Sequence, residues 1–269
     1  MSATSTATEL PAVAAPPRVP DALRSAFYIG VREVRNVLRA PADFLPGLFI
    51  PVFFYFIQVG SLSKFAAQYG LTNYKGFQFP IGLLFAASNG GSGLNMVMDI
   101  ESGYFDKLLL TPVNRLALLL GAMGADLCRI FVQCTFVTVL ALAAGLRFET
   151  GVAGAVVLIL IASLWGLAYS AIGFAIALKT GSPAATQSAW VIFFPLIFLA
   201  PSFAPLSALS GWLRGAASGN PVTYLLQGMR ALSMNGWIAH DIGVGLLAIA
   251  IVGALTVTLA FRGLLSRVR

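Results

Sequence analysis

Apolar stretches long enough to cross a membrane dominate this sequence and limit what it can fold into. Hydrophobic residues make up 58% of the 269 residues and charged residues only 10%, against roughly 25% charged in soluble domains. A membrane-spanning helix needs about 20 apolar residues. We therefore expect an all-α integral membrane protein with six transmembrane helices, at residues 44–63, 77–98, 116–144, 152–178, 184–206 and 242–261.

The Lys and Arg residues predict the orientation of these helices, because cytoplasmic loops carry an excess of them. With both termini inside, the cytoplasmic set is Arg18, Arg24, Arg32, Arg35, Arg39, Lys107, Arg115, Lys179, Arg262, Arg267 and Arg269, against Lys64, Lys75, Arg147, Arg214 and Arg230 outside. We expect a multi-pass protein of the cytoplasmic membrane with both termini in the cytoplasm. The basic residues form no stripe along the chain, so we expect no nucleic acid partner.

The first 41 residues differ from the six-span domain, residues 42–269. Residues 1–20 are rich in Ala, Pro, Ser and Thr, and we expect a disordered cytoplasmic tail. In residues 21–41 apolar residues recur at helical spacing beside a stripe of arginines, which is typical of an amphipathic helix lying in the membrane interface. The arginines expected to face the anionic lipid headgroups are Arg24, Arg32, Arg35 and Arg39.

A charged segment separates the second and third apolar stretches. Its apolar residues recur every three or four positions, which predicts an amphipathic helix over 99–110. Acidic residues lead the segment, where they suit the positive end of a helix dipole, and Pro112 ends it. The predicted orientation places this helix in the cytoplasm, where a soluble partner can reach it.

Asp126 and Arg129 lie three residues apart in the third stretch, and therefore on one face of its helix. Ionisable residues inside a membrane are costly and are functional candidates by default. Two interpretations stay open at this stage. The residues either face a transport path or form a structural pair that neutralises itself near the cytoplasmic end.

The sequence offers little for catalysis. Cys128, Cys134 and the lone His240 are too few to assemble a metal site. A phosphate-binding loop needs G-x-x-x-x-G-K-[ST] after a strand, and the nearest match, residues 173–180, has Leu178 at the second glycine. Residues 90–93 fit the G-x-S-G pattern of rhomboid-like proteases, a remote alternative, but such a serine needs an adjacent histidine. Any ATP must be hydrolysed by another polypeptide.

The order of the motifs resembles the permease subunit of ABC-2 type exporters, most closely the daunorubicin/doxorubicin-resistance permease group. The resemblance covers nearly everything from about residue 22 onward. It rests on Glu101-x-Gly103-x-x-x-x-Leu108-Leu109-x-Thr111-Pro112, Ala125-Asp126-Leu127-x-Arg129, and Asn220-Pro221-Val-Thr223-Tyr224 followed by Arg230-Ala231-Leu232.

This resemblance implies a permease dimer, with an identical or paralogous second protomer, in which each permease rests on a nucleotide-binding ATPase subunit that holds ATP and Mg. The present chain would then be neither an enzyme by itself nor bound to a cofactor. Residues 21–41 would be the connecting helix and 99–110 the coupling helix. The residues expected to meet the ATPase are Asp99, Glu101, Gly103, Tyr104, Asp106, Lys107 and Leu108.

In the resembled family, the first, second and fifth spans border the path of the cargo. Walls with few charges suit a hydrophobic or amphiphilic cargo such as a drug, a natural product or a lipid, and drug or antibiotic resistance is the expected role. Candidate path residues are Phe53, Phe54, Gln58, Asn89, Asn95, Gln187, Phe194 and Phe198. Pro195, Pro201 and Pro205 predict a kink or an early end in the fifth span.

We therefore expect an ATP-driven exporter working by alternating access. The alternative is a secondary transporter driven by an ion gradient, with Asp126 and Arg129 as its relay. Such transporters usually show internal repeats with broken helices at matching positions. Residues 44–144 and 152–261 show no convincing repeat of each other.

Overall fold

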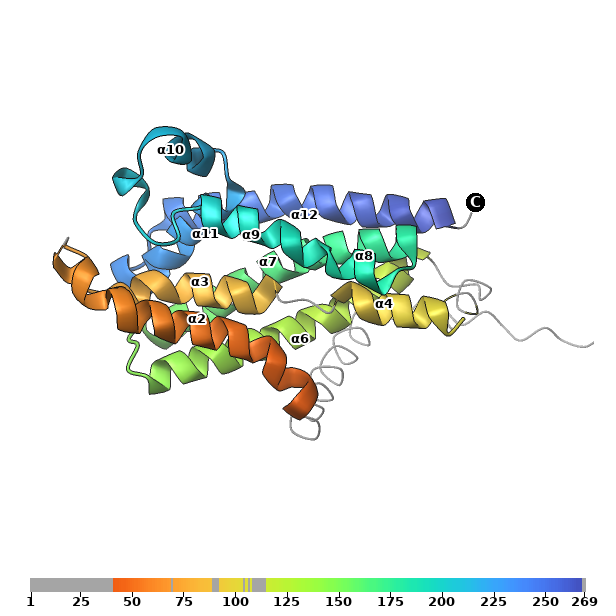
Figure 1. Ribbon diagram of the computed structural model, residues 1–269, viewed down its shortest axis with the longest axis horizontal. Coiled ribbons are helices and arrows are strands. Elements are labelled where there is room, and N and C mark those ends of the chain that lie inside the picture. Colours follow the sequence, from red (N-terminus) through yellow and green to blue (C-terminus); the bar gives the residue numbers. More distant parts are fainter. Residues whose placement is uncertain are drawn as a thin grey trace, which may run out of the picture.

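The computed structural model describes residues 41–68, 70–88, 92–103, 105, 107 and 115–267 (Figure 1). This part of the chain is helical and contains no strand, which confirms the all-α class. Residues 1–40 lie outside the described residues, and with them the predicted tail and the interfacial arginines. Asn89, Tyr104, Asp106 and Leu108 also lie outside.

Four helices in the described part are long and apolar enough to cross a membrane. They correspond to the first, third, fourth and sixth predicted spans. These helices are α2 (Pro41–Gln68), α6 (Arg115–Ala143), α7 (Gly151–Thr180) and α12 (Ala239–Arg267).

The second and fifth predicted spans each correspond to two shorter helices. The second comprises α3 (Tyr74–Ser88) and α4 (Ser92–Glu101). The fifth comprises α8 (Pro183–Gln187) and α9 (Ala189–Leu199), which ends well before residue 206. The early end predicted from the prolines is confirmed, whereas the count of six spans stays a prediction.

Short helices connect α9 to α12. They are η1 (Leu206–Ala208), α10 (Gly211–Ser218), α11 (Pro221–Arg230) and the π-helix η2 (Ala231–Asn235). Figure 1 shows α10 and α11 at one end of the long helices, and α4 with the end of α12 at the other. We call these the α11 end and the α4 end.

Helix α7 lies at the centre, since α3, α4, α6 and α12 all pack against it. Its Trp165 is fully buried, and the indole Nε1 donates a hydrogen bond of 3.0 Å to Ser88 Oγ at the end of α3. At Gly166 a Cβ would lie 2.7 Å from the carbonyl oxygen of Ala87, so the close contact between α3 and α7 needs glycine.

Two side chains from the α11–η2 segment hold the start of α3. Pro80 lies inside α3 and has no N–H to give to the carbonyl of Gly76, four residues earlier. Ser233 Oγ donates to that carbonyl at 2.9 Å, and Arg230 Nε donates to the next one, of Phe77, at 3.1 Å. Ser233 thus replaces the hydrogen bond that the proline removes. We call Arg230 and Ser233 the α3 clamp.

The clamp is itself fixed by packing. The Arg230 guanidinium lies 3.5 Å from the centre of the Phe77 ring, a cation–π contact. Burial lowers the pKa of Arg230 to about 9, so the group keeps its charge at neutral pH. Thr150, before α7, donates through its hydroxyl to the carbonyl of Leu232 at 2.6 Å. The α11 end is therefore joined to both α3 and α7 by buried polar contacts.

Asn220 joins α9 to α11 in a similar way. Its Oδ1 accepts from Val222 N at 3.0 Å and caps α11, while its Nδ2 donates to the Leu196 carbonyl at 2.6 Å. That carbonyl is among the last four of α9, which have no partner within the helix. The Asn220 side chain thus provides hydrogen-bond partners for backbone groups at the ends of two helices.

Candidate functional site

The described part of the predicted coupling segment lies at the α4 end and is amphipathic. Ile100 and Phe105 are buried among apolar residues of α6, α7 and α12. Asp99, Glu101 and Lys107 are exposed. The apolar side holds the segment to the bundle, and the charged side chains remain accessible to a partner.

The segment turns at Gly103. Helix α4 ends at Glu101, and Gly103 adopts a φ of 69°, which favours glycine. Gly103 N donates to Ile100 O at 3.0 Å, and Lys107 N donates to Gly103 O at 3.2 Å. The predicted helix over 99–110 is therefore not continuous, because α4 ends at Glu101 and the backbone is left-handed at Gly103.

Gly93 joins α4 to two other helices. A Cβ at this position would lie 2.6 Å from the carbonyl oxygen of Gly173 in α7 and 2.3 Å from Thr186 Cγ2 in α8. Neither distance is possible for a real side chain, so the packing needs glycine here. Because α4 touches both α7 and α8 so closely, a displacement of α4 must move α8 or separate the helices.

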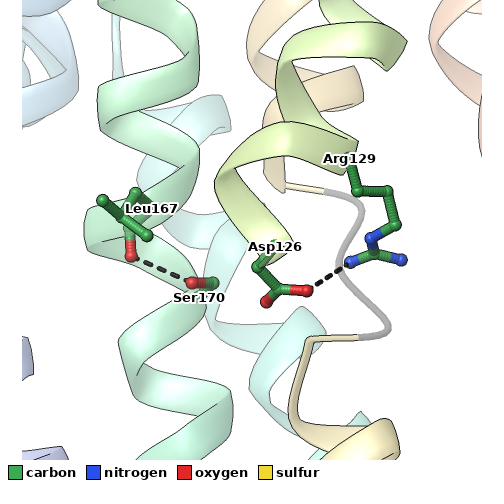
Figure 2. Close-up of polar contacts among 4 residues, drawn as sticks. All are labelled: Asp126, Arg129, Leu167 and Ser170. Carbon is green, nitrogen blue, oxygen red and sulfur yellow. Dashed lines mark hydrogen bonds and ion pairs between the residues drawn. The ribbon is translucent and has the colours of Figure 1, made fainter. Parts of the chain in front are cut away.

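The predicted pair in the third span forms an ion pair. Arg129 Nη2 lies 3.4 Å from Asp126 Oδ1, and the two side chains are 27% and 6% exposed. Figure 2 shows Asp126 on the side of α6 that faces Ser170 of α7, whose hydroxyl donates to the Leu167 carbonyl at 3.0 Å. The geometry accounts for a structural pair, and a transport role stays a prediction.

Aromatic rings bring together two of the predicted path helices. The ring centroid of Phe85 in α3 lies 5.2 Å from that of Phe54 in α2 and 6.4 Å from that of Phe194 in α9. Phe198 follows on α9 at 6.0 Å from Phe194. The first and fifth predicted spans therefore meet across α3, and that they line a path stays a prediction.

The other predicted path residues do not join this cluster. Phe53 is largely exposed on α2, where its ring stacks on Phe49 at 5.5 Å, and Gln58 is half-buried on the same helix. Asn95 and Gln187 are exposed on α4 and α8, which contact each other. The predicted set therefore divides between an aromatic part on α2 and α9 and a polar part on α4 and α8.

Sequence reasoning missed Arg230, which it counted as an outside loop charge. The structure buries this residue against Phe77, so it does not belong in the charge count. Leaving Arg230 out of the count increases the excess of basic residues on the cytoplasmic side, and this strengthens the predicted orientation. Pro80 gives a signal only for the other clamp residue, Ser233, which donates to the Gly76 carbonyl that the proline leaves without a donor.

The comparisons with known proteins agree with the motifs. A family model described as ABC-2 type transporter matches residues 24–234. The chain belongs to the ABC-2 type transporter family. With four long apolar helices in its described part, this ABC-2 transporter chain is a multi-pass membrane protein, and the resemblance inferred from its motifs is confirmed.

Several relatives of this ABC-2 chain are described as permeases. A daunorubicin resistance ABC transporter permease of Streptomyces coeruleorubidus is 26% identical over 155 residues, 57% of this chain and 54% of the relative. A transport permease of Cyanophora paradoxa is 27% identical over 229 residues, 80% of this chain and 77% of the relative. A doxorubicin resistance ABC transporter permease of Mycobacterium tuberculosis is 23% identical over 189 residues, 68% of each chain. The match thus spans about half of the Streptomyces relative.

Proposed function

We propose that this chain is the membrane-spanning permease subunit of an ATP-driven exporter in the cytoplasmic membrane. A separate ATPase subunit binds ATP and Mg and acts on the segment 99–110. Two permease protomers, identical or paralogous, form the path between them, which opens alternately to the two sides. Family membership carries this proposal, and the exposed charges on the described part of the segment support it.

Segment 99–110 is suited to be displaced by a partner subunit. Its exposed Asp99 and Glu101 offer carboxylates to a basic groove of a soluble subunit. Its buried Ile100 and Phe105 transmit any displacement to the ends of α6, α7 and α12, because they are packed against them. The α4 end is then the cytoplasmic side, as the distribution of basic residues predicts.

The packing of Gly93 supplies a route from this segment to the path. Helix α4 presses on α8, and α8 is followed by α9, which carries Phe194 and Phe198. A push on α4 therefore shifts the aromatic wall of the path. The cargo is hydrophobic or amphiphilic, since the described path residues are aromatic rings and amides and carry no charge.

The test is transport in vesicles that contain this chain and its ATPase subunit. We expect the two to co-purify and to transport an apolar fluorescent cargo only with ATP. Glu101→Lys should lower ATP-dependent transport about fivefold or more, with unchanged membrane insertion. Glu149→Lys is the matched control, because Glu149 is also exposed but lies between α6 and α7, and it should transport as the wild type does.

Two results would contradict the proposal. Transport by the chain alone, driven by an ion gradient without ATP, would favour the secondary transporter with Asp126 and Arg129 as its relay. If Glu101→Lys transported as the wild type does, the coupling role proposed for segment 99–110 would be wrong.

A further inference from the structure

Helices α7 and α12 pack side by side and run in the same direction. Thr256 Oγ1 of α12 donates to the Ala168 carbonyl of α7 at 2.7 Å. Seven residues further along each helix, a Cβ at Gly263 would lie 3.2 Å from the Ala175 carbonyl oxygen. Because the two helices advance together, their last turns reach the α4 end at nearly the same level. The proposed function assigns that end to the cytoplasmic side.

Each of these helices carries an exposed basic residue near its end. Lys179 lies in the last turn of α7, and Arg262 lies in the last two turns of α12. The ion pairs formed among the described residues include neither of them. The nearby acidic residues Asp99 and Glu101 belong to α4, which meets α7 at Gly173, about a third of a turn round that helix from Lys179. Two positive charges therefore remain available to a partner.

An apolar stripe runs along α12 toward its basic residue. Leu255, Leu259 and Arg262 follow one another at spacings of four and three residues, so they lie on one side of the helix. The two leucines are 63% and 55% exposed. In a membrane this stripe meets acyl chains, and its basic end reaches toward the lipid headgroups.

Helix α7 carries a second stripe with the same spacing, Ile172, Ile176 and Lys179, whose isoleucines are half-buried. Viewed from the start of the helices, it lies clockwise from the residues of α7 that contact α12. The stripe of α12 lies anticlockwise from the residues that contact α7. In two parallel helices that face each other, these two directions are the same side of the pair. The two stripes therefore form one surface, which we call the α7–α12 face.

We propose that the α7–α12 face binds one anionic phospholipid of the cytoplasmic leaflet. Its acyl chains lie along the two apolar stripes, and its phosphate group is held by Lys179 and Arg262. A guanidinium can donate two hydrogen bonds to one phosphate, and an ammonium adds a compact charge. Basic sites between membrane-spanning helices on the cytoplasmic side suit such headgroups. The proposal rests on the proposed function for one point, that the α4 end faces the cytoplasm.

The experiment titrates lipid into the full chain, purified in detergent without its ATPase subunit, and counts bound molecules by native mass spectrometry. The probes are dioleoyl-phosphatidylglycerol, which has a net negative charge, and dioleoyl-phosphatidylcholine, which has the same chains and no net charge. We expect saturable binding of one phosphatidylglycerol per chain, about fivefold or more tighter than phosphatidylcholine. Bound phosphatidylglycerol should also raise the unfolding temperature, since it contacts two helices of the folded state.

Variants of the two basic residues test the site itself. Lys179→Gln and Arg262→Gln should each weaken phosphatidylglycerol about 2- to 10-fold and leave phosphatidylcholine unchanged. Lys64→Gln is the matched control, because Lys64 is an exposed base near the other end of the molecule, on α2, and it should bind both lipids as the wild type does. Without lipid all three variants should unfold at the wild-type temperature, since the replaced side chains are exposed and form no ion pair with a described residue.

Three results would overturn the proposal. The two lipids could bind equally, or Lys64→Gln could weaken phosphatidylglycerol as much as Lys179→Gln does, which would make the effect one of overall charge. Inorganic phosphate at the same concentration could displace phosphatidylglycerol, which would make the face a site for free phosphate. None of these results bears on ATP-dependent transport. If transport failed while phosphatidylglycerol binding depended on Lys179 and Arg262, the proposed function would fail alone.

Discussion

The two helices of the second predicted span, α3 and α4, differ in how firmly they are held. Every residue of α3 except Lys75 is buried, and the helix contacts α2, α6, α7, α11 and η2. Helix α4 buries only one side, against α6, α7 and α8, and exposes Asn95, Met98, Asp99 and Glu101. A substitution in α3 or its clamp should therefore affect stability, and a substitution at the end of α4 should affect function.

Removal of the clamp arginine should have the largest effect on stability. Arg230→Ala loses a charged hydrogen bond and a cation–π contact and leaves a cavity, so we expect about 2–4 kcal/mol of destabilisation. Arg214→Ala on the exposed face of α10 is the matched control and should change stability by less than about 0.5 kcal/mol. Thermal unfolding in detergent, followed by circular dichroism, measures both. Equal unfolding temperatures for the two variants would show that the clamp contributes nothing.

The serine of the clamp permits a sharper test, by a double-mutant cycle with Pro80. Ser233→Ala should cost about 1–3 kcal/mol, since the Gly76 carbonyl loses its donor. With Pro80→Ala the backbone N–H returns to that carbonyl, and Ser233→Ala should then cost less than about 0.5 kcal/mol. Unfolding of the four proteins in denaturant gives the coupling free energy. Additive effects would mean that Ser233 does not replace the missing N–H.

The Asp126–Arg129 pair should show an intermediate effect. Asp126→Asn or Arg129→Gln alone leaves one charge without its ion-pair partner and should cost about 1–2 kcal/mol, reduced by the partial exposure of Arg129. The double variant should be more stable than the sum of the single effects predicts. Transport by the double variant decides between the two interpretations of the pair: full activity supports the structural one, and lost activity in a stably folded protein supports the functional one.

The end of α4 should show the smallest effect on stability. Glu101→Lys replaces an exposed side chain at the end of a helix, and we expect a change below about 0.5 kcal/mol. Gly103→Ala should cost about 1 kcal/mol, because alanine is strained at a φ of 69°. If Glu101→Lys instead lowered the unfolding temperature as much as Arg230→Ala, the contrast between α3 and α4 would fail.

Local sequence rules predicted the long helices and the ion pair, because both depend on short-range properties. Twenty apolar residues can satisfy their backbone inside a membrane only as a helix, which gives α2, α6, α7 and α12. Asp126 and Arg129 meet because residues three apart share a helix face. The amphipathic character of the described part of segment 99–110 follows from the same periodicity.

Tertiary contacts were beyond these rules. Hydropathy alone does not show that the second predicted span comprises two helices, because both are apolar. The clamp links residues more than 150 positions apart, Phe77 with Arg230 and Gly76 with Ser233. The meeting of Phe54 and Phe194 across Phe85 likewise depends on how α2, α3 and α9 pack. No periodicity along one segment reports such contacts.

Hydrogen exchange of α3 and α4 in the complex with the ATPase subunit tests the account most directly. Amide protons of α3 should exchange slowly, and ATP should leave their rates unchanged, because the clamp and the core hold this helix. Amide protons of α4 and of the turn at Gly103 should change their exchange rates when ATP binds. Equal changes in α3 and α4, or no change in α4, would contradict the proposal that force enters through the α4 end.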